Sequence, residues 1–236
     1  MAVQLNSPEV RPFAEIPLVG LAIKRGDPYL HVGFLYRNDA EEIRLSHLPF
    51  HYRFRGSDIP EHSYFWLEPQ FNEMVREQVA AFLAHVAEEN ETGEIPYSII
   101  NRETAFDESG KYVPSGVGHG LTCASYILSI FHALNVPLLN FQTWPAGRVG
   151  DDQWAESILA KLATADPPAS PEHIAAQRAE LPNIVRFRPE EVGAAFTIFT
   201  NTALTFEAVE PSSLELLALL PPPPPPVLAS NLVEAD

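Results

Sequence analysis

Apolar runs separated by turn residues occupy the first fifty positions of the chain. Pro17–Ile23 is a short apolar run typical of a buried strand, and Gly-Asp-Pro at 26–28 predicts the turn that follows it. Residues 30–36 are rich in β-branched and aromatic side chains and predict a second strand. Residues 42–48 alternate between apolar and polar side chains and predict a third. The last two strands together predict a β-hairpin over 30–48.

The next part of the chain is predicted to be mainly helical. Apolar residues between Pro69 and Glu89 recur every three or four positions, which predicts an amphipathic helix with its proline in the first turn. Residues 97–100 predict a short strand, and a loop with four glycines follows at 101–120. Three more segments are predicted as helices: 121–134, which is apolar and long enough to be buried, 151–163, and one that starts at Ser170, where a cap residue precedes a proline.

Composition narrows the class of protein. The chain has 236 residues, which suits one domain, expected at residues 1–206, followed by a tail. Its formal net charge of -16 repels phosphate groups and anionic head groups, so we expect neither nucleic acid nor membrane as a partner. One cysteine permits no intramolecular disulfide and no cysteine-rich metal site. With no visible signal sequence or membrane-length apolar stretch, the expected location is the cytoplasm, although export without a signal stays open.

Residues 207–236 read as a proline-rich tail. Six consecutive prolines at 221–226 favour an extended polyproline II rod, because proline has no backbone N–H to donate. We therefore expect the chain from about residue 215 onward to be removable without unfolding the domain. The proline run is suited to docking on an aromatic groove of an SH3- or WW-like protein partner, or to acting as a spacer.

The single cysteine stands where the glycine-rich loop enters the predicted helix. Unpaired N–H groups and the helix dipole at such a position stabilise a thiolate, which predicts a lowered pKa for the Cys123 thiol. The same N–H groups stabilise the oxyanion that forms when a thiolate attacks a carbonyl. The alternative is that Cys123 is a buried core residue, as most cysteines on apolar helices are.

A nucleophilic cysteine needs a base and a group that orients the base. His31 and His47 lie on the two strands of the predicted hairpin, and both are expected on core-directed faces, which is unusual for histidine. His119, in the loop four residues before the cysteine, is a second candidate base. A metal site built from His47, His51 and His62 is a further alternative, although it lacks a carboxylate at a defined helical spacing.

These segments resemble a known arrangement. LHVGFLY at 30–36, a polar turn, LSHL at 45–48 and then GLTCASY at 120–126 are similar to the circularly permuted papain-like proteins of the NlpC/P60 superfamily, which include the lecithin:retinol acyltransferase-like branch. In that branch the histidine strand precedes the cysteine helix. The resemblance covers about residues 18–135. Thr122 stands where those proteins usually have asparagine, and the hairpin turn is longer here.

The resemblance implies an α+β, papain-like fold in which an antiparallel β-sheet packs against the helix that bears the cysteine. It implies Cys123 as nucleophile, His31 as base and His47 as the orienting residue, with Glu42 or Ser46 as alternatives for the orienting role. It implies no metal and no cofactor.

The function expected from these observations is that of a cysteine peptidase or amidase. Such an enzyme hydrolyses a peptide or other amide substrate through a Cys-His acyl-enzyme mechanism. One alternative is a lipid or thioester acyltransferase of the same fold. The other is a non-catalytic acidic interaction protein that binds its partner through the polyproline tail.

Overall fold

The computed structural model describes residues 2–26, 29–101 and 104–222. Residues 27 and 28 of the predicted turn and most of the proline run therefore lie outside the described residues. Five strands form one antiparallel sheet in the order β4-β3-β2-β1-β5. Their bounds are β1 Val19–Arg25, β2 Leu30–Arg37, β3 Ile43–His47, β4 Arg55–Asp58 and β5 Phe65–Leu67.

The predicted hairpin is confirmed. β2 and β3 pair antiparallel with Leu35 opposite Leu45, and β1 pairs along the other edge of β2. The strand predicted at 97–100 does not form, because Tyr97 makes only an isolated parallel bridge to Leu121. This bridge nevertheless brings the segment around Tyr97 beside the chain that leads into the cysteine helix.

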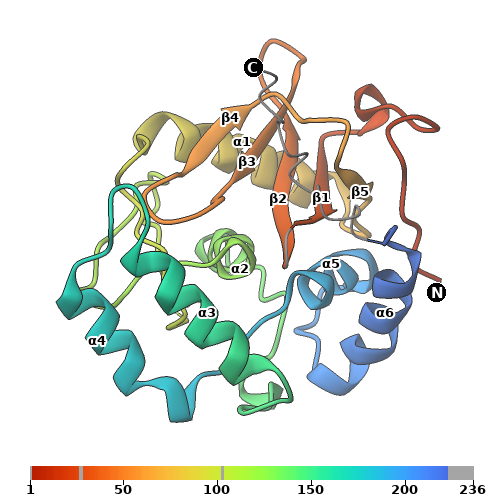
Figure 1. The fold of residues 1–236 in the computed structure, drawn as a ribbon. Coiled ribbons are helices and arrows are strands. Elements are labelled where there is room, and N and C mark those ends of the chain that lie inside the picture. Colours follow the sequence, from red (N-terminus) through yellow and green to blue (C-terminus); the bar gives the residue numbers. More distant parts are fainter. Residues whose placement is uncertain (1, 27–28, 102–103, 223–236) are drawn as a thin grey trace, which may run out of the picture.

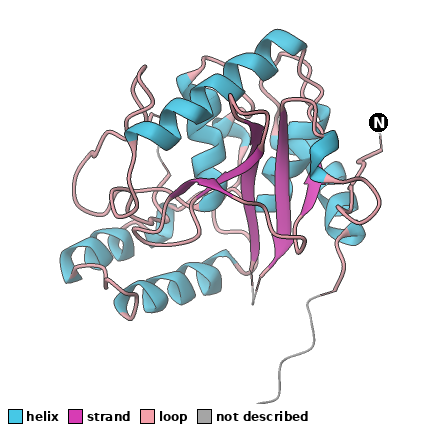
Figure 2. Ribbon diagram, turned by 90° about the horizontal axis from the view of Figure 1, so that it is seen from above, coloured by secondary structure: helices cyan, strands magenta, loops and turns pink. Residues whose placement is uncertain are grey.

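The described residues form six α-helices, of which α1 lies behind the sheet and the others lie below it in the view of Figure 1, while Figure 2 shows the same arrangement from above. They are α1 Glu73–Glu89, α2 Cys123–Ala133, α3 Asp151–Ala163, α4 Pro171–Ala179, α5 Pro189–Ile198 and α6 Phe206–Leu219, with short 3-10 turns at Phe13–Glu15, Phe141–Thr143 and Leu181–Asn183. The helices predicted over 69–89, 121–134, 151–163 and from Ser170 are confirmed, the first beginning only at Glu73, after its cap residue Asn72. Among the described residues, no helix combines the length and the apolar character needed to cross a membrane.

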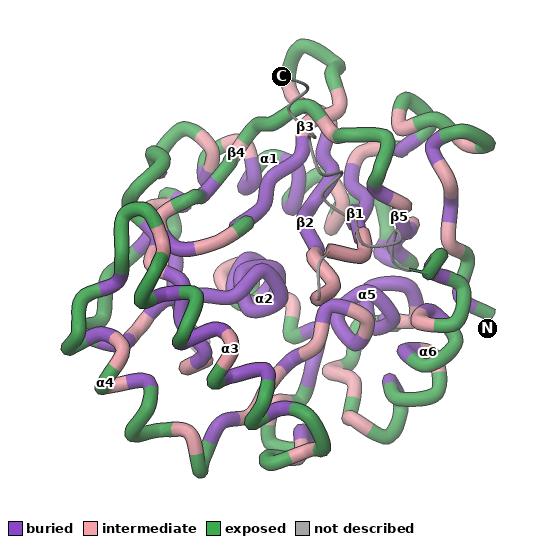
Figure 3. Tube along the Cα trace, in the orientation of Figure 1, coloured by how far each residue is buried: buried purple, intermediate pink, exposed green. Residues whose placement is uncertain are grey.

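Helix α2 is the centre of the molecule. Every residue from Cys123 to Phe131 is buried, and Figure 3 shows this helix enclosed by sheet and helices. An apolar helix without charges is stable only when it is covered on all sides, and α1, α5 and the sheet supply that cover. The ring of Phe34 on β2 lies 5.5 Å from Phe131 and 6.2 Å from Tyr126, centroid to centroid. The architecture is thus α+β, with an antiparallel sheet packed on the cysteine helix.

The two faces of the sheet have different neighbours. Val32 and Phe34 on β2 belong to the core that includes α1, α2 and α5. Leu35 and Leu45 belong to a second, smaller cluster with Tyr64 and Trp66, on the opposite face. Because side chains alternate along a strand, His31 shares the face of Leu35, away from the helices.

The C-terminal segment differs from the expected tail. Residues 207–219 belong to α6, which packs on α5 and buries Val209 and Leu216. The side chain of Arg25 donates hydrogen bonds to the carbonyl oxygens of Leu217 and Pro221 at 3.0 and 2.6 Å. The sequence predicted a tail because the many prolines in this segment obscured its helical pattern. The packed fold continues to the last described residues, so a cut at residue 215 would remove part of the core.

Candidate active site

The chain entering α2 is held tightly. Thr122 caps the helix, its hydroxyl accepting from Ser125 N at 3.0 Å while Ser125 Oγ accepts from Thr122 N at 2.8 Å. Gly120 lies against the neighbouring segment so closely that a Cβ there would be 2.2 Å from the carbonyl oxygen of Pro96. Glycine is therefore required at this crossing. The result is that Cys123 occupies the first helical position with its N–H unpaired within the helix.

A second glycine brings the two hairpin histidines together. A Cβ at Gly33 would lie 2.7 Å from the Cβ of His47, so only glycine lets the His47 side chain lie across β2. His31, two residues earlier on the same face, then meets it. His31 Nε2 and His47 Nδ1 are 2.8 Å apart.

Asp58 on β4 continues this chain of contacts. Its Oδ2 atom lies 3.4 Å from His47 Nε2, and a carboxylate can only accept a hydrogen bond when it is ionised. His47 therefore carries its proton on Nε2 and accepts at Nδ1 from the Nε2–H of His31. In this tautomer, His31 Nδ1 is left with a lone pair. Tyr64 adds a second contact to His47, with its hydroxyl 3.4 Å from the same Nδ1 atom.

Cys123, His31 and His47 line one cavity of about 450 Å³. Its walls also include Asp58, Tyr64 and Tyr97, so the linked histidines and their partners open into the same space as the thiol. The three residues predicted from the sequence thus line the same cavity. No hydrogen bond joins the Cys123 sulfur to His31 among the described residues, and catalytic hydrogen bonds are commonly long in ligand-free enzymes.

Burial favours the neutral form of both members of the cysteine–histidine pair. Burial raises the pKa of the Cys123 thiol, although the backbone N–H groups of Val32 and Ala124 act in the opposite direction. The expectation of a lowered pKa is therefore wrong, because the cost of desolvating a thiolate exceeds the stabilisation at the helix N-terminus. Burial, with the nearby His47 and Lys24, lowers the pKa of His31 to about 3.

Tyr97 contacts the nucleophile. Burial raises the pKa of its phenol, and the thiol and the backbone N–H of Cys123 lie close enough to act on that pKa as well. The Tyr97 hydroxyl and the backbone N–H of Cys123 thus lie next to each other beside the sulfur. Together they suit the oxygen of a carbonyl under attack by that sulfur. No sequence pattern assigned Tyr97 to the site. The glycine-rich loop that follows Tyr97 in the chain was the only nearby sequence signal, because the adjacency of Tyr97 and Cys123 depends on the tertiary fold.

Comparison with known proteins adds no relative. No family model matches this chain, and neither do any curated protein or solved structure.

The alternatives for the orienting role lie elsewhere. Ser46 faces the helix side of the sheet, where its hydroxyl is 2.5 Å from the hydroxyl of Tyr126. Glu42 is an exposed residue that pairs with Arg44. Neither has a hydrogen bond with His31 among the described residues, so His47 alone of the three candidates contacts it.

The other histidines do not join the cavity of Cys123. His119, the second candidate base, lines a separate cavity of about 420 Å³ with His51 and His173. His62 is exposed. Within the described part of the chain, no three His, Cys, Asp or Glu side chains are placed to hold a metal ion, so the arrangement of His47, His51 and His62 does not form.

His51 and His173 hold the backbone of Tyr97 through hydrogen bonds. The backbone N–H of Tyr97 donates to His51 Nδ1 at 3.1 Å, and its carbonyl oxygen lies 2.9 Å from His173 Nε2. His173 Nδ1 accepts from Gly118 N at 3.2 Å, which fixes the proton on Nε2. The backbone of Tyr97 is thus held on both sides, which positions the residue beside Cys123.

Proposed function

We propose that this protein is a thiol-dependent hydrolase that cleaves an amide bond through an acyl-enzyme on Cys123. The observation that carries the proposal is the contact of 2.8 Å between His31 Nε2 and His47 Nδ1, made beside Cys123 in one cavity. It leaves one lone pair of the imidazole, at Nδ1, available as a base. The resemblance to permuted papain-like proteins supports the same assignment of roles.

In this mechanism the resting pair is a thiol and a neutral imidazole. The sulfur attacks the substrate carbonyl carbon as His31 Nδ1 takes the thiol proton, so a C–S bond forms and the carbonyl π electrons move to oxygen. The Tyr97 hydroxyl and the Cys123 N–H donate to that oxygen. The His31 imidazolium is stabilised by His47 Nδ1, which accepts from its Nε2–H.

The intermediate then collapses. The C–N bond breaks and His31 gives its proton to the leaving nitrogen, which departs as an amine and leaves a thioester on Cys123. Water, deprotonated by the same His31, attacks the thioester and releases a carboxylic acid and the free thiol. An amine needs a proton donor to depart, whereas an activated phenolate does not. Because His31 can supply this proton while His47 orients it, the two histidines favour amide substrates.

Acylation of the protein by a small activated ester, followed by mass spectrometry of the intact chain, tests this function. We expect one acyl group per chain, located on Cys123 and released on incubation in water. Cys123→Ala should not be acylated, and His132→Ala, an exposed residue of the same helix, serves as the matched control. A wild-type chain that gains no acyl group on Cys123 would favour the non-catalytic interaction protein.

A further inference from the structure

The cavity of Cys123 has the opposite charge balance to the chain as a whole. The chain has 31 acidic and 15 basic residues. The cavity is lined by four basic residues, Lys24, Arg55, Lys161 and Arg186, and by two acidic ones, Asp58 and Glu61. Glu61 is paired with Lys24 at 3.0 Å, and Asp58 lies 3.4 Å from the neutral His47, so the four cations outnumber the two carboxylates. The unmatched charge in the cavity is therefore positive.

Two of the cations meet on one wall. Lys161 Nζ lies 5.5 Å from the ring centroid of Tyr29, and the guanidinium carbon of Arg186 lies 5.9 Å from the same centroid. Arg186 also lies 4.2 Å above the ring of Trp154. Trp154 and Lys161 lie seven residues apart on α3, so they share a helix face, and both line the cavity. Tyr29, Trp154, Lys161 and Arg186 form what we call the cationic subsite.

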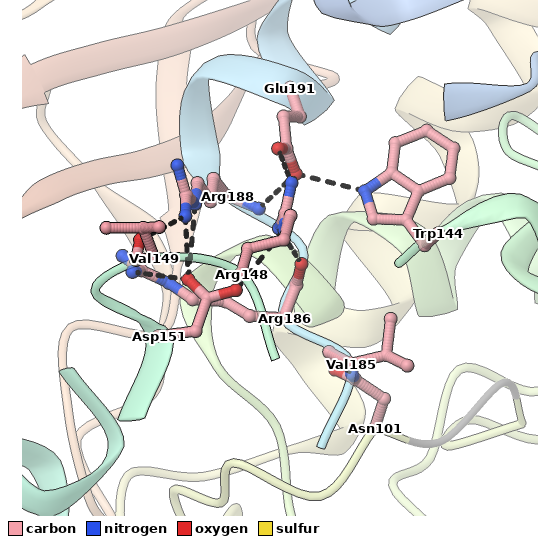
Figure 4. Close-up of polar contacts among 9 residues, drawn as sticks. All are labelled: Asn101, Trp144, Arg148, Val149, Asp151, Val185, Arg186, Arg188 and Glu191. Atoms are coloured by element: carbon pink, nitrogen blue, oxygen red, sulfur yellow. Dashed lines mark hydrogen bonds and ion pairs between the residues drawn. The ribbon is translucent and has the colours of Figure 1, made fainter. Parts of the chain in front are cut away.

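Asp151 holds the side chain of Arg186 but does not occupy all of its N–H donors. Its Nη1 lies 3.2 Å from Oδ1 of Asp151, a carboxylate that also binds Arg148 at 3.2 Å and Arg188 at 2.9 Å (Figure 4). One carboxylate thus serves three guanidinium groups. A guanidinium has five N–H donors in a planar fork, and Asp151 occupies only part of that of Arg186.

The remaining acidic residues nearby do not fill the subsite. Glu191 is occupied by Arg148 and by the indole N–H of Trp144, the latter at 3.0 Å (Figure 4). The charge of Glu190 acts on Arg186, but Glu190 lines a different cavity. Lys161 has no ion pair within the described residues.

We propose that the cationic subsite binds a carboxylate of the substrate, so that the protein acts on acidic, peptide-like amides. A carboxylate matches the planar fork of Arg186, with Lys161 as a second point charge. The apolar side chains of Ile158 and Phe187, which also line the cavity, suit the methylene groups that connect such a carboxylate to the amide. The inference rests on the proposed function, because it assumes that the substrate amide reaches Cys123.

The subsite is close enough to the nucleophile to act on the same molecule. The positive charge of Arg186 lowers the pKa of both the Cys123 thiol and the Tyr97 phenol, against the larger effect of burial. The carboxylate can belong to an acidic side chain or to the end of a peptide, and the ligands of the test separate these two sources.

The test measures how well three small ligands protect Cys123 from iodoacetamide. N-acetylglutamic acid α-amide carries only the side-chain carboxylate, N-acetylglutamine only the terminal one, and N-acetylglutamine amide neither. We expect one of the first two to protect at a concentration about tenfold or more below that of the neutral ligand, as a charge-assisted hydrogen bond gives. Which one does so identifies the source of the carboxylate.

Two variants assign that preference to the subsite. Lys161→Gln alters an exposed residue and should fold, and Arg186→Gln removes the guanidinium; each should reduce the preference several-fold. Arg178→Gln, which alters an exposed arginine paired with Glu156 at 3.1 Å, is the matched control and should leave it unchanged. Equal protection by the neutral ligand, or a preference that survives in both variants, overturns the inference.

A separate readout distinguishes failure of this inference from failure of the proposed function. Calorimetric titration with the same three ligands measures the preference without using the thiol. If iodoacetamide does not label Cys123 even in the absence of ligand, the proposed function is contradicted. The titration then still decides whether a carboxylate binds. Normal labelling with no preference for a carboxylate in either assay contradicts only the subsite.

Discussion

His31 Nε2 lies 2.8 Å from His47 Nδ1, and this contact determines which nitrogen of His31 is left to act on the thiol. Asp58 fixes the proton of His47 on Nε2, so the two histidines are linked in one direction only. The two rings therefore have different roles, and substitutions can separate them.

His31→Ala should abolish turnover, with a loss of about a thousandfold or more in kcat/KM, because the base and the proton donor disappear together. His47→Ala should cause a smaller loss. His47→Gln should recover part of it, because an amide oxygen can still accept from the His31 N–H. Steady-state kinetics on one amide substrate provides the comparison. Equal losses in both alanine variants would show that His47 does more than orient.

Tyr97→Phe should lower kcat by about a hundredfold to a thousandfold with little change in KM, because the hydroxyl serves the oxyanion more than the bound substrate. The phenylalanine ring keeps the packing, so the Tm should stay near that of the wild type. Kinetics on the same substrate, with Tyr52→Phe as control, measures the effect. A change confined to KM would place the Tyr97 hydroxyl in substrate binding instead.

The rate of Cys123 alkylation should rise with pH through a midpoint above that of a free thiol, because burial raises the pKa of the thiol in the folded protein. Iodoacetamide labelling across a pH series, with a small-molecule thiol as reference, gives the two midpoints. A midpoint near neutral pH would instead reveal a thiolate–imidazolium pair in the resting protein.

Stability should fall as the solution is acidified below about pH 6.5. The folded-state pKa is lowered to about 3 for His31 and to about 4 for His51, so between these values and 6.5 the unfolded chain binds protons that the folded chain does not. Their stabilising contribution is complete above pH 6.5 and is lost as pH falls through that window. Urea unfolding at a series of pH values tests this.

The variant His51→Gln should make that acid dependence shallower, since an amide oxygen can still accept from Tyr97 N without titrating. His85→Gln, at a ring that is mostly exposed on α1, is the matched control. Parallel pH profiles for wild type and His51→Gln would contradict the role given to His51.

Helix α6 should contribute to the stability of the domain. Leu216→Ala should cost about 2–5 kcal/mol of unfolding free energy, because the side chain is fully buried against α5. Leu214→Ala, two positions earlier and 61% exposed, should cost far less. Thermal unfolding of the two variants compares them directly, and equal Tm values would mean that α6 is not part of the folded core.

The sequence by itself determined the local elements and the identity of the central residues. The β-branched and aromatic content of 30–36 and the alternation over 42–48 predicted the hairpin, and the apolar segment after the glycine loop predicted α2 with Cys123 at its start. These signals depend only on neighbouring residues. Helix α6 escaped prediction because Pro211 and the proline run at 221–226 obscured its spacing, and α5 because its apolar residues form an unbroken run at 192–196 instead of recurring every three or four positions. The same local reasoning placed His31 and His47 on adjacent strands.

Only the tertiary structure decided how those residues act. Tyr97 lies beside Cys123 because Gly120 allows its segment to pass close to Pro96 and because His51 and His173 bind the backbone of Tyr97. These contacts join segments far apart in the sequence. The direction of the thiol pKa also depended on the fold, because desolvation is set by everything packed around the sulfur, whereas the sequence shows only the helix end. Long-range packing, unlike periodicity, leaves no signal in any single stretch of the chain.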